Sequence, residues 1–268
     1  MQQPPADRWG DGDPYERYVG RWSRRLAPLF LRWLGMERRC TWADVGCGTG
    51  ALTEAILAGE EPLAVHGIDR SAGFLAAARE RTTDARAQFH QADATALPLP
   101  DGACDAAVSG LVLNFVPEPA RMVAEMRRIT RPGGRVAAYV WDYAGGMQMM
   151  RIFWDAAVEV APPGTAPDQA ERFPICAPAP LAAAWVAAGL QAVDVQPIEI
   201  ATEFRSFDDF WTPFLGRQGA APTYLASLAP AQQESIRAAA ARRVPQDASG
   251  RIALKALAWA AQGRCPPA

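Results

Sequence analysis

The chain has 268 residues, of which 50% are hydrophobic and 21% charged, so it is long enough for one large α/β domain with an insertion. Its 27 Lys and Arg residues against 29 Asp and Glu residues give a formal charge of −2, which excludes the strongly basic composition of many nucleic-acid-binding proteins. No segment approaches the roughly 18 uninterrupted apolar residues of a membrane span. The five cysteines form no CxxC pair, so neither a disulfide framework nor a zinc site is expected. These features predict a soluble, cytoplasmic protein.

The first half of the chain alternates between predicted strands and helices. Residues 1–13 are polar and rich in Gly and Pro, which predicts a flexible tail. The segment 14–39 has an aromatic helical face at Tyr15, Tyr18 and Trp22, and Pro28 is expected to divide it into two helices. Strands then follow at 41–45, 63–68, 87–91, 104–109 and 135–141, with helices at 51–57, 71–82 and 118–129. This alternation predicts a doubly wound, mostly parallel Rossmann-like α/β sheet with helices on both faces.

The second half of the chain completes the predicted sheet. Helices are expected at 144–160 and 179–189, strands at 191–205 and 252–260, and a mainly helical region at 207–244. The two added strands bring the sheet to seven. The organisation expected is an N-terminal helical lid at 14–39, an α/β domain at 40–206 and 249–263, and a helical cap insert at 207–248.

The segment Asp44-Val45-Gly46-Cys47-Gly48-Thr49-Gly50 is the most informative in the chain. Glycines at alternate positions after a strand allow a tight turn whose backbone a ligand can approach closely, at the sheet edge where α/β proteins bind ligands. Gly46, Gly48 and Ala51 also satisfy the fingerprint of a dinucleotide-binding turn. The glycines alone therefore leave the ligand open.

Three aspartates narrow the choice of ligand. Asp69 ends the second predicted strand, where a carboxylate can accept hydrogen bonds from both ribose hydroxyls of a ligand. Dinucleotide-binding proteins also have an acid at this position, so Asp69 does not distinguish them from other nucleoside-binding proteins. Asp44 precedes the glycine turn, and Asp93 follows the third strand. An acid beside the turn favours a cationic ligand, because it repels a pyrophosphate of like charge.

Several segments together resemble one family. They are Asp44–Gly50, Ile68–Ser71, Gln91–Ala94, Leu97–Asp105 and Arg131–Gly134. The chain resembles a class I S-adenosylmethionine-dependent methyltransferase of the small-molecule group that includes the quinone-biosynthesis methyltransferases, over residues 40–142. The resemblance implies S-adenosyl-L-methionine as cofactor and a small-molecule methyl acceptor, with no nucleic-acid or membrane partner.

The resemblance also implies roles for individual residues. Gly46 and Gly48 pass beneath the methionyl part of the cofactor, and Asp44 helps to hold its ammonium group, directly or through water. The remaining expected cofactor contacts are Asp69 with its neighbour Arg70 at the ribose, Asp93 and Ala94 at the adenine, the backbone at Ser109 beside the amino-acid group, and Trp22 on the lid. Asn114 stands where relatives often have histidine.

The substrate side is expected at the end of the fifth strand. Asp142 and Tyr143 are the candidate catalytic residues, with Asp142 as a hydrogen-bond partner or weak base for the acceptor. The aromatic residues Trp211, Phe214 and Tyr224 fit either a pocket wall or ordinary core. No metal site is expected, and His66 and His90, which fall within predicted strands, are interpreted as structural.

Two other functions use the same kind of fold. An NAD(P)-dependent reductase needs a Tyr–Lys pair or similar after the fourth strand, and residues 108–118 contain neither residue type. A non-catalytic binding module does not require all three aspartates for its stability, so the complete set counts against this alternative. The sequence leaves open whether carbon, oxygen or nitrogen accepts the methyl group, and it does not set the oligomeric state.

Overall fold

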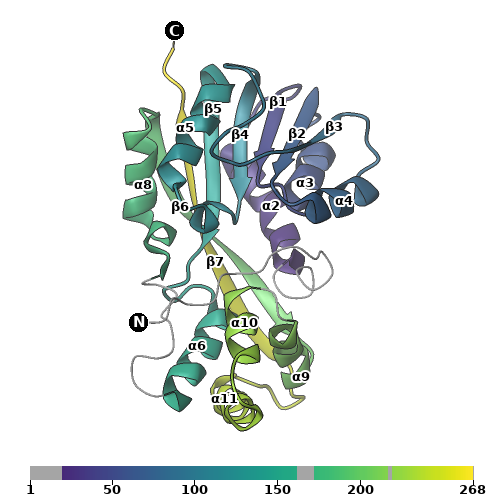
Figure 1. Ribbon diagram of the computed structural model, residues 1–268, viewed down its shortest axis with the longest axis vertical. Coiled ribbons are helices and arrows are strands. Elements are labelled where there is room, and N and C mark those ends of the chain that lie inside the picture. The colour runs from purple at the N-terminus through teal and green to yellow at the C-terminus, as the bar shows by residue number, and fades with distance from the viewer. Residues whose placement is uncertain (1–19, 162–171, 217–218, 268) are drawn as a thin grey trace. The chain divides into compact units, whose positions relative to one another are not determined.

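The computed structural model describes residues 20–161, 172–216 and 219–267 (Figure 1). Its sheet has seven strands in the order β3-β2-β1-β4-β5-β7-β6. Strands β1 to β5 are parallel, and β7 runs antiparallel to β5. The strands are β1 (Thr41–Val45), β2 (Ala64–Asp69), β3 (Ala87–Gln91), β4 (Cys104–Gly110), β5 (Thr130–Trp141), β6 (Gln191–Phe204) and β7 (Ile252–Arg264). The predicted mostly parallel, seven-stranded α/β sheet is confirmed.

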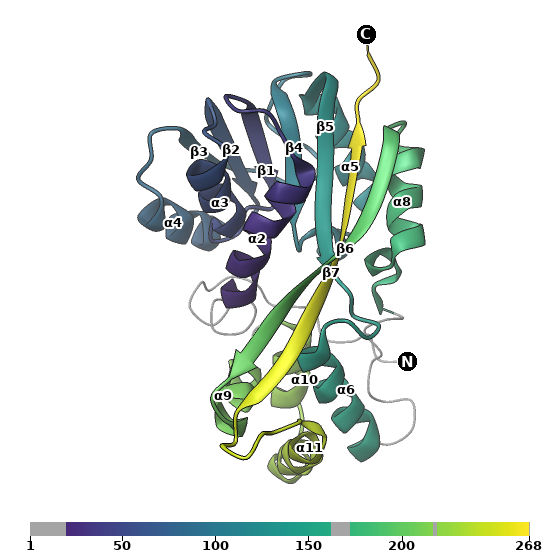
Figure 2. The same cartoon turned by 180° about the vertical axis from the view of Figure 1, so that it is seen from behind.

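Helices cover both faces of the sheet, as the buried strands require. Helix α2 (Arg21–Leu34) lies on one face (Figure 2). Its Phe30 ring packs on Tyr139 of β5 with ring centroids 4.7 Å apart. The helices α5 (Pro119–Ile129) and α8 (Pro178–Ala187) belong to the other face (Figure 1), where the Trp185 indole donates to the Val136 carbonyl at 3.0 Å. The remaining helices are α3 (Ala51–Gly59), α4 (Ala72–Arg81), α6 (Gln148–Val160), α9 (Phe207–Trp211), α10 (Ala220–Ala226) and α11 (Pro230–Arg243).

Pro28 does not divide the N-terminal helix, so that prediction was wrong. Helix α2 is continuous through Pro28, which lies on its exposed side. Proline removes one backbone hydrogen bond, but the carbonyl thereby released faces water and can be solvated. Burial of the opposite face, including Leu26, Phe30 and Leu34, holds the helix together.

The regular pairing of β5 with β4 is interrupted at residues 131–134. Thr130 pairs with Cys104 of β4, and regular pairing resumes only where Arg135 meets Ala106. Gly133 has a φ of +75°, a left-handed conformation that glycine adopts without strain. The turn expected before the fifth strand is therefore an irregularity inside a longer strand.

The chain forms two compact units. The described residues of the sheet unit lie within Trp22–Trp141, Ile175–Ile198 and 258–267, and those of the helix-rich unit lie within 20–21, Asp142–Pro174 and Glu199–Leu257. The helical insert expected at 207–248 falls within the helix-rich unit. In the part of the chain that the structure describes, no helix has both the length and the apolar character needed to cross a bilayer.

Aromatic rings form the core of the helix-rich unit. Phe153 stacks on Phe214 with centroids 4.7 Å apart, and Trp154 packs against Tyr224 at 5.3 Å. Trp211 joins the same stack, and all five side chains are buried. Such mutual burial favours the core interpretation of Trp211, Phe214 and Tyr224 over a role as pocket walls.

Candidate functional site

The glycine turn lies at the carboxyl end of β1 and is tied to β2 by backbone hydrogen bonds. The amides of Gly46 and Cys47 both donate to the Ile68 carbonyl, at 2.7 and 3.0 Å. The Gly48 amide donates to the Asp69 carboxylate at 3.0 Å. The turn is therefore held in place without any ligand.

The two glycines expected under the cofactor differ in what surrounds them. A Cβ atom at Gly46 would lie 2.6 Å from the Val112 side chain, so packing against the segment after β4 already demands glycine there. A Cβ at Gly48 would meet nothing within 4 Å, and its φ is +55°. Open space above a left-handed glycine is where a ligand can lie against the backbone.

Asp44 is a buried carboxylate with one oxygen left unsatisfied. It is 1% exposed, and only its Oδ2 atom has a partner, the Thr53 hydroxyl of α3 at 2.7 Å. Its Oδ1 atom is buried with no hydrogen-bond partner. Burial raises the pKa of Asp44 to about 7. The unsatisfied oxygen of this buried carboxyl group can accept a hydrogen bond from a cationic ligand.

Asp69 holds the loops around it with both oxygens. Besides the Gly48 amide, it accepts the Ser71 amide at 2.8 Å. Burial raises its pKa above the ordinary range, partly offset by those two backbone hydrogen bonds. A carboxylate has about four lone-pair positions, so two remain for the hydroxyls of a ribose.

The segment after β3 is arranged to leave one amide free. Asp93 is exposed and accepts the amide and the hydroxyl of Thr95, at 2.8 and 2.6 Å, which lowers its pKa. Within the described part of the chain the Ala94 amide has no hydrogen-bond partner, so it can donate to a ligand. Arg70 is exposed, and its backbone carbonyl accepts a hydrogen bond from the side-chain amide of Gln91 at 3.1 Å.

Ser109 and the segment that follows it close the carboxyl end of β4. The strand register places Ser109 on the face opposite to Asp44, so any contact with a ligand at the turn is through its backbone. Leu111 has a φ of +63°, and its amide donates to the Tyr139 carbonyl at 2.8 Å. A non-glycine residue in this conformation is strained, and it turns the chain so that Val112 covers Gly46.

Of the other predicted residues, Trp22 precedes the glycine turn in the chain, and Asp142 and Tyr143 follow β5. Trp22 is 4% exposed, and the Arg25 guanidinium lies 5.7 Å from its ring centroid. Asp142 accepts the amides of Ala144 and Gly145 at 2.9 and 3.3 Å, which makes it the first residue of a turn. The half-buried Tyr143 ring packs against Phe173 with centroids 5.3 Å apart. Asp142 and Tyr143 belong to the helix-rich unit, and their catalytic role stays a prediction.

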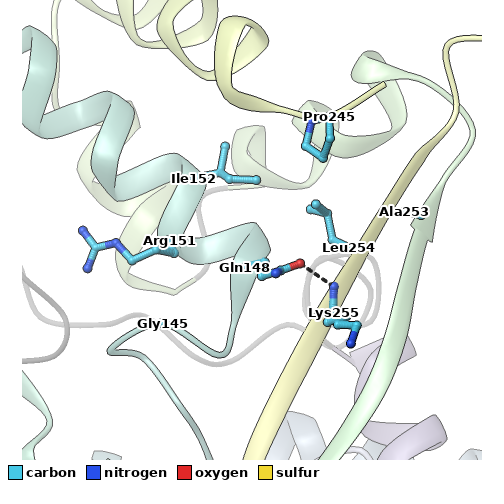
Figure 3. A pocket seen from close by; sticks show the side chains of 8 residues that line it. All are labelled: Gly145, Gln148, Arg151, Ile152, Pro245, Ala253, Leu254 and Lys255. Carbon is cyan, nitrogen blue, oxygen red and sulfur yellow. Dashed lines mark hydrogen bonds between the residues drawn. The ribbon is translucent and has the colours of Figure 1, made fainter. Parts of the chain in front are cut away.

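The helix-rich unit also contains a cavity of about 490 Å³ at the start of α6, shown in Figure 3. The Gln148 side chain crosses it to accept the Lys255 amide at 2.8 Å. Lys255 itself pairs with Glu199 at 2.8 Å. None of the predicted site residues lines this cavity, so it adds nothing to the candidate cofactor site.

Comparison with known proteins agrees with the geometry of the turn. Residues 43–138 match the family described as "Methyltransferase domain". This segment is a class I methyltransferase domain. It includes the glycine turn, Asp69, Asp93 and Ser109, which are the residues that the geometry gathers at the carboxyl edge of the parallel strands.

Two relatives show how far the likeness to the methyltransferase domain extends. An uncharacterized methyltransferase of Mycolicibacterium gilvum is 39% identical over 142 residues, which cover 51% of this chain and 55% of the relative. A demethylmenaquinone methyltransferase of Renibacterium salmoninarum is 39% identical over 114 residues, covering 42% of this chain and 46% of the relative. The chain thus matches about half the length of these relatives, and the distant resemblance to quinone-biosynthesis methyltransferases is confirmed.

Solved structures share the fold. A phosphoethanolamine N-methyltransferase 2 of Haemonchus contortus, in complex with S-adenosyl-L-methionine, superposes with a TM-score of 0.58 at 17% identity. That match covers 94% of this chain and 56% of the other. The [4+2]-cyclase SpnF superposes with a TM-score of 0.55 at 21% identity, over 100% of this chain and 88% of the other.

The residues present fit S-adenosylmethionine, as the family implies. The unpartnered Asp44 oxygen suits its ammonium group, the open space at Gly48 suits its methionyl chain, and Asp69 retains acceptor capacity for ribose. Sequence reasoning missed Thr53 and Val112, which position Asp44 and the turn. Thr53 lies nine positions beyond Asp44, in the first turns of a predicted helix. Only the side of that helix on which Thr53 lies could have indicated the contact from the sequence.

Proposed function

We propose that this protein transfers a methyl group from S-adenosylmethionine to a small-molecule acceptor by direct displacement. The observation that carries the proposal is the buried Asp44 carboxylate, whose Oδ1 atom has no partner, at the edge of a glycine turn with open space above Gly48. An ammonium group satisfies that oxygen with a charge-assisted hydrogen bond, which is stronger than the bond a neutral donor gives, whereas a pyrophosphate would be repelled by the ionised carboxylate.

The residues of the site are arranged to bind and orient the cofactor. S-Adenosylmethionine, when bound, supplies a methyl group attached to a sulfonium centre, from which a neutral thioether departs readily as the leaving group. Asp44 holds the ammonium end, Asp69 holds the ribose, and the Ala94 amide and Asp93 flank the adenine. Fixing the donor in this way contributes through alignment, which is worth roughly 7–11 kcal/mol when both reactants are well oriented.

The acceptor is proposed to be a small molecule. The relatives that match the domain include enzymes named for demethylmenaquinone, trans-aconitate and phosphatidylethanolamine, which are chemically diverse. We propose Asp142 as the hydrogen-bond partner or weak base for that acceptor, with Tyr143 beside it, because both directly follow β5. Trp22 on α2 is proposed to cover the cofactor.

Titration calorimetry with S-adenosylmethionine, S-adenosylhomocysteine and NADH tests the cofactor. We expect binding of the first two and none of NADH. Asp44→Asn keeps the shape of the side chain but removes its charge, so it should weaken binding of both sulfur ligands. NADH binding alone would support the reductase and overturn the proposal.

Methyl transfer itself needs a separate experiment, because a [4+2]-cyclase shares this fold. The protein is incubated with cofactor carrying a labelled methyl group and a fractionated metabolite extract. Label is expected in a small-molecule fraction and absent with the Asp44→Asn variant. Tight cofactor binding with no labelled product from any extract would favour a non-catalytic module.

A further inference from the structure

The only two histidines in the chain meet on neighbouring strands. His66 lies on β2 and His90 on β3, and the Nδ1 atom of His66 is 3.2 Å from the Nε2 atom of His90. Their ring centroids are 5.4 Å apart, with the planes inclined by 37°. The two imidazoles therefore direct ring nitrogens toward each other.

A third polar side chain shares their face of the sheet. The strand register pairs His66 directly with Gln88 of β3, and Gln88 lies two residues before His90, so all three point to the same side. This side is opposite to Asp44, which pairs with Gly67 of β2. Both histidines are half-buried and Gln88 is exposed, which leaves the cluster open to small solutes.

The surroundings of both histidines favour the neutral imidazole. Burial, and then the neighbouring His90, lowers the pKa of His66. Burial, and then the charge of Arg79, lowers the pKa of His90. Neutral imidazoles carry the lone pairs that metal ions require.

We propose that His66 and His90 bind one late first-row divalent cation, of the class of Zn²⁺, Ni²⁺ and Cu²⁺, with the remaining positions taken by the Gln88 carboxamide oxygen and water. Imidazole nitrogens are preferred ligands of these ions. An ion at about 2.1 Å from both nitrogens would subtend roughly 100° between nitrogens at the observed separation, which suits tetrahedral or octahedral coordination. No third His, Cys, Asp or Glu joins the pair among the described residues.

Binding requires one internal rearrangement. The hydrogen bond between the rings uses a proton on one of the two facing nitrogens, and coordination needs both of these nitrogens free. The ring that carries this proton must change tautomer, so that its proton lies on the outer nitrogen. No net proton is released, because both rings start neutral. The site lies on the opposite face from Asp44 and takes no part in the proposed methyl transfer.

Titration of the full-length, untagged protein with ZnCl₂ and with NiCl₂ at pH 7.5 tests the site, with MgCl₂ as a negative control. We expect one ion per chain, bound at least tenfold more weakly by His66→Gln and by His90→Gln. Gln88→His adds a third imidazole to the same face and should strengthen binding at least tenfold. Ala183→His, on the exposed side of α8, adds an imidazole elsewhere and should not.

Two further readouts separate the site from weak surface binding. Binding should fall at pH 5.5, where protons compete for the imidazoles, and excess Zn²⁺ should raise the melting temperature of the wild type but not of the doubly substituted protein. Equal affinity in wild type and double variant, or no gain from Gln88→His in a folded protein, would overturn the proposal. Titrating the same samples with S-adenosylhomocysteine shows whether the cofactor site is intact, so failure of one proposal is distinguishable from failure of the other.

Discussion

The Asp69 carboxylate accepts a hydrogen bond from the Gly48 amide at 3.0 Å, and so joins the end of β2 to the turn that follows β1. The same carboxylate is proposed to bind the cofactor ribose. One side chain would thus both hold the turn and contact the ligand, and substitutions at Asp69 can separate these two effects.

Asp69→Ala should weaken S-adenosylhomocysteine binding by about 1.5–3 kcal/mol, the range for hydrogen bonds to a charged group. Asp69→Asn keeps one oxygen, which can accept either the Gly48 or the Ser71 amide but not both, so it should lower the melting temperature less than Asp69→Ala does while still losing affinity. Calorimetry gives the affinity, and the melting temperature reports the turn. Asp194→Ala, on the half-buried stretch of β6 at the opposite edge of the sheet from β3, is the control and should leave the affinity unchanged. Unchanged affinity in a folded Asp69→Ala protein would remove Asp69 from the site.

Gly48 and Gly46 should respond differently to added side chains. Gly48→Val is expected to abolish cofactor binding, because the new side chain occupies the open space proposed for the ligand. The protein should stay largely folded, because that side chain meets no other protein atoms within 4 Å of its Cβ. The left-handed backbone adds a cost of about 1–2 kcal/mol. Gly46→Ala should instead lower the melting temperature by clashing with Val112, and Val112→Ala should partly restore it. Calorimetry and thermal unfolding of the four proteins check both expectations, and retained binding by Gly48→Val would place the ligand elsewhere.

Asp44 should make the stability of the ligand-free protein depend on pH. Its pKa in the folded protein, about 7, lies above the ordinary 3.8, so the folded state binds the proton more tightly. The resulting stability is fully present below about pH 4 and is lost as the pH rises through 7. Asp44→Asn mimics the protonated acid. Its advantage over the wild type in the free energy of unfolding should therefore grow by about 1–3 kcal/mol from pH 5 to pH 8, since one pKa unit corresponds to about 1.4 kcal/mol. Urea unfolding at both values measures this gain, and a difference that stays constant with pH would contradict it.

Cofactor binding should show the opposite dependence on pH. An ammonium group pairs with the ionised form of Asp44, so the affinity for S-adenosylhomocysteine should rise as the pH increases from 6 to 8, by up to about tenfold per unit below the pKa. Asp44→Asn should bind weakly and without this trend. A wild-type affinity that is flat over the range would show that Asp44 does not hold the charged group.

The aromatic cluster of the helix-rich unit should behave as core. Phe214 is fully buried and stacks on Phe153, so Phe214→Ala is expected to cost about 3–5 kcal/mol in the free energy of unfolding. Tyr143 is only half-buried, and Tyr143→Ala should cost much less. Chemical denaturation of both variants measures these costs, and a Phe214→Ala protein as stable as the wild type would reopen the pocket interpretation.

The sequence by itself determined the features that depend on neighbouring residues. Strand and helix alternation predicted the sheet, and the helix expected from residue 71 has Ser71 as its cap, since the Ser71 hydroxyl accepts the Phe74 amide at 3.2 Å. The glycine turn and the aspartates at strand ends followed from spacing alone, because parallel strands bring their carboxyl ends to one edge. Contacts between residues a few positions apart are determined by the local sequence.

Only the tertiary structure decided the contacts between distant segments. Gly46 faces Val112, Asp44 accepts the Thr53 hydroxyl, and His66 meets His90, and none of these pairs has a spacing that marks it in the sequence. Pro28 stays within a helix because the opposite face of α2 is buried, which overrides its local preference to break helices. Packing free energy depends on which surfaces meet, and that is a property of the folded chain.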